Sequence, residues 1–448
     1  MSKVTLVGAG SVLWAPKILG DFYVSQARRV DEICLMDVNA AALEPIVALA
    51  SRMEDRTGRG LSVTAETDLE RAAAGADYVV VSIAVGGLEA MARDLEVPTR
   101  FGTYPTVGDT VGPSGLSRLL RNAPVFLDLA ARIESAAPRA WLINLSNPLT
   151  PLTWLIGETT SLKTVGLCAG IVNHLWILKD LLEVAGPEEV DFSVAGIDHC
   201  SWFLELKARE RDLYPRLRAM SVDELDAGAS LGHSLDEWAG LDSLTAGFTL
   251  FEALGYLPAI SDRHLGEFFP YFLSGDRELR RYNMKRTGIS HRQRWGREAR
   301  ERLRAILSGE REPGLSKSRD IVVDVIEALD GAGAIRTTVN YRNAGQVGGL
   351  PDGAVVETAA RVSTGRIEPE AVDGLPPQLL AVVEPHIHRQ QLAVRAALEG
   401  SREMFTAALA TDPTVYSLER VGELANALIE ANQDHLPRFR EPGAARPG

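Results

Sequence analysis

The stretch "VTLVGAGSVLWAPKIL", residues 4–19, decides the fold. An apolar run ends in Gly-Ala-Gly, and the residues after it carry apolar side chains at helical spacing. This strand–turn–helix pattern is typical of a dinucleotide site, because Gly8 and Gly10 allow backbone N–H groups to approach a pyrophosphate. The third glycine of the usual pattern is absent, and Ala15 or Pro16 stands near its place. The motif therefore needs support from its context.

That support comes from Asp37, which ends the next apolar run 27 residues after Gly10. A carboxylate there can accept hydrogen bonds from both ribose hydroxyls and would repel a 2′-phosphate, which favours NAD over NADP. The alternative is an ordinary glycine turn of a doubly wound fold, with Asp37 as a helix N-cap. We expect Ser11 and Asn144 to add further cofactor contacts.

The first 190 residues alternate between short apolar runs and helical patterns. The predicted strands are "KVTLVGAG", "EICLMDVN", "LSVTAETD", "DYVVVSIAV", "AWLINLSNP" and "LKTVGLCAG". Such alternation predicts an α/β fold, a Rossmann-like doubly wound parallel sheet over residues 1–190. After residue 190, long helical patterns and the loop-rich stretches "ALGYLPAISDRHLGEFFPYF" and "NYRNAGQVGGLPDGAVVET" predict an α+β domain over residues 191–448 for substrate binding and oligomerisation.

Composition narrows the class of partner. The 448 residues include 47 basic and 60 acidic side chains, a formal net charge of −13 that disfavours nucleic acid and anionic membranes. Three scattered cysteines do not form a disulfide framework. The chain begins directly with a strand pattern and has no apolar run long enough to span a membrane. We expect a cytoplasmic protein that acts on a small molecule.

Polar side chains gather where the predicted strands end, which is where α/β folds bind ligands. They are Asp109, Thr110, Asn144, Asn147, Cys168, Asp198, His199, Asp262, His264 and Glu267. Cys168 ends "TVGLC", and His199 stands 31 residues later in a second strand-like run. From the residues alone, this thiol and imidazole could be buried packing residues, a nucleophilic pair or two ligands of one metal.

Seven motifs then occur in one order: "GAGS", "GDTVGPSG", "INLSNP", "VGLC", "GIDHCSWF", "RNAGQVGGLPDGAVVE" and "LIEANQDHLPRF". In this order the chain resembles the NAD-dependent glycosidases of glycoside hydrolase family 4 and their relatives, in the branch of α-glucosidases, α-galacturonases and NAD-dependent sulfoquinovosidases. The resemblance implies a redox-neutral reaction. Bound NAD⁺ accepts a hydride from C3 of the sugar, a base removes the acidified C2 proton, the C1 substituent leaves, water adds, and the hydride returns.

The resemblance also implies a divalent metal, usually Mn²⁺, held by Cys168 and His199. Two residues depart from the family pattern: Ala169 stands where a polar residue often follows the cysteine, and Asp198 replaces the usual Asn before the histidine. A relative without metal would need a nearby Arg, Lys or His to polarise the C2–C3 region.

The other site residues follow from the same resemblance. Asp109 is expected to be the acid at the leaving group, and Asp262 the base, although Asp262 also reads as a helix N-cap. Asn147 and His264 are expected to contact sugar hydroxyls. Arg286, within the basic segment "MKRTGISHRQR", is expected to bind an anionic C6 group.

Three functions compete on these observations. The first is a glycosidase acting on an α-glycoside, with an anionic C6 group such as that of a uronide or sulfoquinovoside. The second is an NAD-dependent dehydrogenase of the malate or lactate type, and the third is a nucleotide sensor without activity. The family resemblance favours the first, and with it a homodimer or homotetramer.

Overall fold

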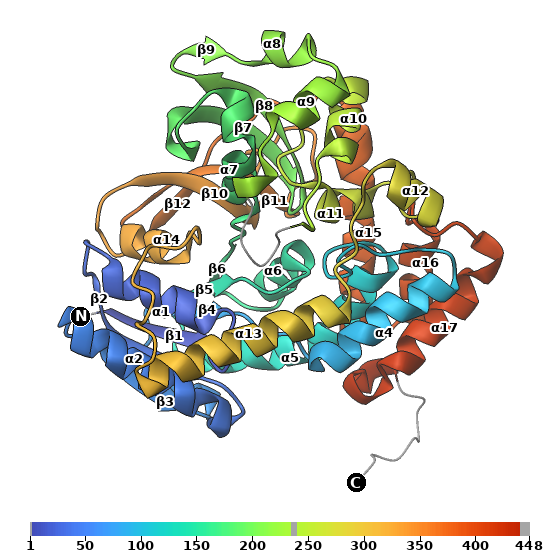
Figure 1. Cartoon of the computed structure of the whole chain (residues 1–448). Coiled ribbons are helices and arrows are strands. Elements are labelled where there is room, and N and C mark those ends of the chain that lie inside the picture. The colour runs from blue at the N-terminus through green and yellow to red at the C-terminus, as the bar shows by residue number, and fades with distance from the viewer. Residues whose placement is uncertain (1, 234–239, 440–448) are drawn as a thin grey trace.

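A computed structural model describes residues 2–233 and 240–439, whose strands form one 12-stranded sheet in the order β3-β2-β1-β4-β5-β6-β10-β11-β7-β8-β9, with β12 paired to β11 (Figure 1). The six predicted strands are confirmed as β1 (Ser2–Val7), β2 (Val30–Met36), β3 (Ser62–Glu66), β4 (Tyr78–Val81), β5 (Trp141–Asn144) and β6 (Lys163–Gly166). They pair in parallel, in the order 3-2-1-4-5-6 of a doubly wound dinucleotide-binding sheet.

Helices cover both faces of this parallel sheet. They are α1 (Ala15–Val24), α2 (Ala40–Thr57), α3 (Leu69–Ala73), α4 (Gly87–Arg100), α5 (Gly112–Ala136), α6 (Leu149–Thr159) and α7 (Gly170–Leu182). Side chains alternate across β1, so Val4 and Leu6 belong to the core under α1 and α2, whereas Val7 belongs to the core under α3 and α5. This packing fixes where the strand ends emerge and so where the polar residues lie.

The second half of the chain extends the same sheet. Its strands are β7 (Val190–Ile197), β8 (Cys200–Ala208), β9 (Arg211–Asp212), β10 (Ile335–Arg342), β11 (Val355–Ser363) and β12 (Arg366–Pro369). β10 joins β6 antiparallel through Asn340 and Gly166. The interpretation of residues 340–358 as loop is therefore wrong at both ends, where β10 and β11 pair. The glycine-rich turn between them obscures two short strand patterns.

The remaining helices are α8 (Tyr214–Arg218), α9 (Val222–Gly228), α10 (Thr245–Leu254), α11 (Asp262–Leu265), α12 (Asp276–Arg281), α13 (Ile289–Ser308), α14 (Val322–Leu329), α15 (Pro377–Glu399), α16 (Arg402–Ala410) and α17 (Val421–Ala431). α15 and α16 pack against α5 of the first half, and α13 runs across α2 and α4 (Figure 1). In the described ranges no helix is long and apolar enough to cross a membrane.

Candidate active site

The predicted nucleotide turn lines one large cavity. Gly8, Gly10, Ser11 and Asp37 lie around a volume of about 840 Å³ at the ends of β1, β2 and β4. Gly8 has a φ of +91°, and a Cβ there would lie 2.2 Å from the Ser82 carbonyl oxygen, so this position requires glycine. The Gly10 N–H donates to Asp37 Oδ2 at 3.0 Å. The structure thus brings together four of the five residues predicted to contact the cofactor.

The fifth residue, Asn144, does not belong to this cavity. Its side chain is fully buried, donates to Thr153 Oγ1 at 3.1 Å and accepts from the Ser146 N–H at 2.9 Å. The amide shapes the turn after β5 and presents no group to a ligand. The structure therefore places the Asn144 side chain in its own turn and outside the cavity lining, a role that a polar residue at a strand end can equally serve.

A second, smaller cavity of about 240 Å³ adjoins the first. Asp109, Asn147, Cys168, His199 and His264 all line it. Asn147 lines both cavities and so stands at their junction. The structure therefore gathers five predicted site residues, from segments far apart in sequence, beside the nucleotide turn.

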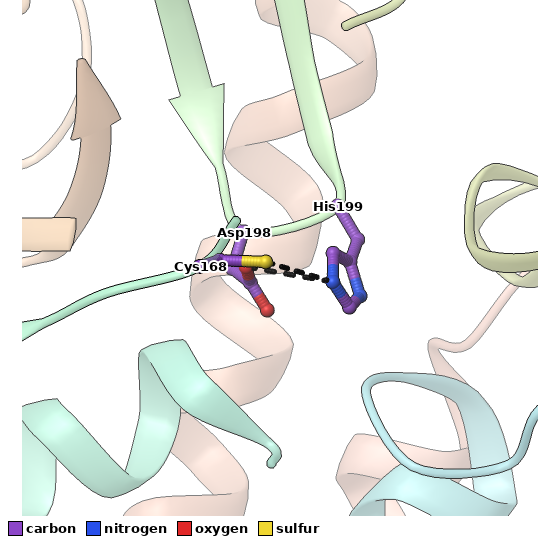
Figure 2. A group of neighbouring side chains, drawn as sticks. All are labelled: Cys168, Asp198 and His199. Carbon is purple, nitrogen blue, oxygen red and sulfur yellow. Dashed lines mark hydrogen bonds and ion pairs between the residues drawn. The ribbon is translucent and has the colours of Figure 1, made fainter. Parts of the chain in front are cut away.

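Cys168 and His199, which line this cavity, form a compact group with the buried Asp198 (Figure 2). Cys168 Sγ lies 3.4 Å from His199 Nε2, and Asp198 Oδ1 lies 3.7 Å from the same nitrogen. Asp198 and His199 form the two-residue turn between β7 and β8, where His199 has a φ of +63°. A left-handed conformation is unfavourable for residues other than glycine and asparagine, so the fold holds this imidazole in place against a local preference.

Thr110 sets the orientation of the histidine. Its Oγ1 lies 2.8 Å from His199 Nδ1 and donates to Asp109 Oδ1 at 3.1 Å. Because the hydroxyl hydrogen is used on the carboxylate, the hydroxyl accepts the proton of Nδ1–H. The lone pair of Nε2 then faces Cys168 and Asp198, which is the arrangement of a metal-binding histidine.

Burial is the largest cause of the pKa shifts of Cys168 and His199. It raises the pKa of the Cys168 thiol well above its usual range, with the Asp198 and Glu357 carboxyls acting in the same direction. Burial lowers the pKa of His199 to about 4, so this imidazole is neutral near pH 7. Thiol, carboxyl and neutral imidazole donors within 4.8 Å of one another suit a divalent transition metal such as Mn²⁺.

A buried carboxyl positions the loop that carries Asp109. Glu267 Oε1 accepts from the N–H groups of Val107 and Gly108 at 2.7 and 2.8 Å. Burial raises the Glu267 pKa to about 7. On the same wall, Arg292 Nη2 lies 4.0 Å from Asp109 Oδ2, and His264 packs on His199 with ring centroids 4.0 Å apart.

Asp262 lies outside the cavity. Its carboxylate accepts from the Ala246 and Gly247 N–H groups at 2.9 and 2.8 Å and from the Ser243 hydroxyl at 3.0 Å. Both oxygens therefore serve the N-terminus of α10, and the residue is fully buried. The structure does not support Asp262 as the base; the capping alternative describes it better, although the helix it caps is α10 and not its own.

Arg286 is also placed elsewhere. Its Nε donates to the Pro105 carbonyl at 2.9 Å, its Nη2 donates to Thr99 Oγ1 at 3.2 Å, and the guanidinium covers the Tyr104 ring. Arg286 does not line the cavity, so the structure places this predicted substrate contact apart from Asp109, Cys168 and His199. A basic segment does not reveal which of its arginines turn inward.

Arg292, Arg263 and Asp242 also line the cavity. Arg263 donates to Asp242 Oδ1 at 3.2 Å and to Thr287 Oγ1 at 2.8 Å. Arg292 Nε is buried without a hydrogen-bond partner. The signal for the arginines was present as a cluster of basic residues, whereas Asp242 had no motif around it.

Fold and site together define an α/β enzyme in which a dinucleotide-binding sheet adjoins a small polar cavity. The model of family 4 glycosyl hydrolases matches residues 3–184, and that of the family's C-terminal domain matches residues 194–415. The chain belongs to the family 4 glycosyl hydrolases, which confirms the resemblance and makes the protein a glycosidase.

Individual relatives agree over nearly the full length. An α-galacturonidase from Bacillus subtilis (strain 168) is 30% identical over 421 residues, covering 92% of this chain and 93% of the relative. The solved structure of LplD from the same species, described as a glucosidase, superposes with a TM-score of 0.87 at 29% identity, covering 96% and 99% of the two chains. A 6-phospho-α-glucosidase from gut microorganisms, solved with NAD and Mn²⁺, shares the fold with a TM-score of 0.82 at 22% identity, covering 97% and 99%.

Proposed function

We propose that this glycosidase cleaves α-glycosides that carry an anionic group at C6 and uses NAD as a catalytic cofactor. One observation carries the proposal: the cavity with the glycine turn and Asp37 adjoins the cavity with Asp109, Cys168 and His199, and Asn147 lines both. A sugar in the smaller cavity can thus face a nicotinamide. Sequence relatives named as an α-galactosidase and an α-galacturonidase support the α configuration of the glycosidic bond that is cleaved.

The proposed roles follow from the position of each side chain. NAD, when bound, would supply a hydride acceptor for C3 of the sugar and return the hydride after cleavage. Asn147, at the junction, would orient the C2 and C3 hydroxyls, and His264 would bind a neighbouring hydroxyl. Asp109 would give a proton to the glycosidic oxygen, for which Arg292 and the Thr110 hydroxyl hold it in place.

The C2 proton needs an acceptor other than Asp262. Asp242 is the second carboxylate that lines the cavity, and its contact with Arg263 fixes its orientation. We infer that Asp242 is the candidate base. In D₂O, Asp242→Asn should lose C2 deuteration of the product, whereas Asp262→Asn should retain it if α10 remains folded. The opposite outcome would return the role to Asp262.

The anionic preference rests on Arg292. Its buried Nε has no hydrogen-bond partner, and the side chain lines the cavity. A guanidinium held in this way can pair with a carboxylate or sulfonate. We propose a uronide as the first candidate substrate and a sulfoquinovoside as the second.

The test uses 4-nitrophenyl α-galacturonide, α-sulfoquinovoside and α-galactoside with catalytic NAD⁺ in D₂O. We expect nitrophenol release, deuterium at C2 of the product and no net NADH, with an anionic substrate preferred. Accumulation of NADH without cleavage would support a dehydrogenase instead. Because Arg292 also contacts Asp109, Arg292→Met should lower kcat/KM for both substrates, but roughly 10- to 100-fold more for the anionic one than for the neutral one. The matched control is Arg294→Met, since Arg294 is exposed on the same helix.

A further inference from the structure

Asp198 is one of the two residues that depart from the expected family pattern, and its carboxylate is in an unusual environment. The side chain is 0% exposed, and among the residues that the structure describes neither carboxylate oxygen has a hydrogen-bond partner. Its polar neighbours are the Cys168 thiol and His199 Nε2, the latter at 3.7 Å (Figure 2). A buried carboxylate without donors is strongly unfavourable unless a cation or a proton compensates it.

Apart from His199, the ionisable groups next to Asp198 are themselves acidic. Glu357 is also fully surrounded by protein, accepting from Ser201 Oγ at 2.6 Å and from Asn340 Nδ2 at 3.2 Å. Within the described ranges, no lysine or arginine forms a salt bridge with Cys168, Asp198 or Glu357. Three acidic groups therefore lie close together in the protein interior, and no lysine or arginine of the described residues is paired with them.

The other two donors already face the same point. Thr110 directs the lone pair of His199 Nε2 toward Cys168, and the Gly170 N–H donates to the Cys168 sulfur with an N···S distance of 3.3 Å. One atom from each of Cys168, Asp198 and His199 lies within 4.8 Å of the other two, which is compatible with three ligands around one ion.

We propose that Asp198 is a third protein ligand, beside Cys168 and His199, of one divalent transition-metal ion at the base of the sugar cavity. This inference adds a ligand to the metal site of the proposed function. It depends on the presence of that metal and not on the identity of the substrate. A thiolate, a carboxylate and a neutral imidazole carry a total charge of −2, which balances the ion. Asparagine at this position would leave a net positive site and a weaker oxygen donor. The remaining coordination positions stay open to sugar hydroxyls and water.

The test measures Mn²⁺ binding to the full-length chain directly. Protein treated with EDTA and dialysed is titrated with Mn²⁺, and the free ion is followed by electron paramagnetic resonance. We expect one site per chain in the wild type and a Kd raised about 100-fold or more in Asp198→Asn. Glu357→Gln is the matched control. It removes a buried acid that shares the field but is held by its own hydrogen bonds, so we expect a change below about 10-fold.

The outcomes separate the possibilities. Equal affinity in wild type and Asp198→Asn, equal losses in Asp198→Asn and Glu357→Gln, or no stoichiometric Mn²⁺ in the wild type would each overturn the inference. If Asp198→Asn does not fold without metal, Asp198→Glu keeps the charge and displaces the donor, and its Kd should still rise at least about 10-fold. Glycoside cleavage with NAD⁺ by a wild type that binds no Mn²⁺ in the titration would leave the proposed function standing while removing Asp198 as a ligand.

Discussion

The two ends of the active site bind by different physical means. At the nucleotide end, the turn between β1 and α1 offers backbone N–H groups and space for a ligand. This turn tolerates no side-chain atoms at Gly8 and Gly10. At the sugar end, buried ionisable side chains lie close together, and the carboxylate oxygens of Asp198 have no hydrogen-bond partner among the described residues. Steric fit therefore limits binding at the nucleotide end, whereas the balance of charge limits binding at the sugar end. Substitutions should therefore lower affinity by crowding at one end and alter charge or proton transfer at the other.

The strongest test of the sugar end is Asp109→Asn. We expect kcat for an alkyl α-glycoside to fall roughly 10²- to 10⁴-fold, because the amide cannot give a proton to the leaving oxygen. With a 4-nitrophenyl leaving group the loss should be much smaller, since nitrophenolate leaves without protonation. Steady-state rates on the two substrates decide the point, and equal losses on both would contradict Asp109 as the acid.

The corresponding test of the nucleotide end is Gly10→Ala. A Cβ there would lie 2.7 Å from the Ala42 Cβ and 2.8 Å from Asp37 Oδ2. The crowding should cost about 1–3 kcal/mol and raise the Kd for NAD roughly 10- to 100-fold, with Mn²⁺ binding unchanged. Isothermal titration with each ligand measures both. Gly157→Ala is the control, because a Cβ there meets nothing within 4 Å. Loss of Mn²⁺ binding in Gly10→Ala would show that the two ends are not independent.

The same contrast explains which parts of the molecule could be predicted from sequence. The strands, the glycine turn and the Cys168–His199 pair were all predictable, since each depends on local periodicity or on a motif. Asn144, Asp262 and Arg286 do not line the two cavities, because their partners come from turns and helices distant in sequence or from the residue's own turn. A polar side chain that caps a neighbouring helix has the same sequence pattern as one that faces a ligand.

Thr110→Val tests the link between the acid and the metal-binding histidine. The valine removes the hydroxyl that lies 2.8 Å from His199 Nδ1 while keeping a similar shape. We expect the Kd for Mn²⁺ to rise about 10-fold, because the ring loses the partner that fixes its tautomer. Titration followed by paramagnetic resonance measures this. Thr110→Ser restores the hydroxyl and should restore affinity, whereas a persistent loss in the serine variant would point to packing instead.

The smallest expected effect concerns stability at the sugar end and its dependence on pH. Burial raises the pKa of Glu267 from its ordinary value of 4.5 to about 7. Between those values the folded protein keeps a proton that the unfolded chain has lost, so the free energy of unfolding should fall as pH rises toward 7 and then level off. Glu267→Gln cannot lose this proton, and its Oε1 can still accept from Val107 and Gly108.

Urea unfolding of both proteins from pH 4.5 to 8 provides the measurement. The two should be similarly stable at pH 4.5, and the glutamine variant should become relatively more stable as pH rises, by at most about 1.4 kcal/mol per pH unit. Parallel curves would mean that Glu267 titrates alike in the folded and unfolded chains. Gly10→Ala adds a methyl group and no ionisable group. It should therefore lower the free energy of unfolding by a similar amount at every pH, without changing its slope against pH. This difference separates an effect of crowding from an effect of charge.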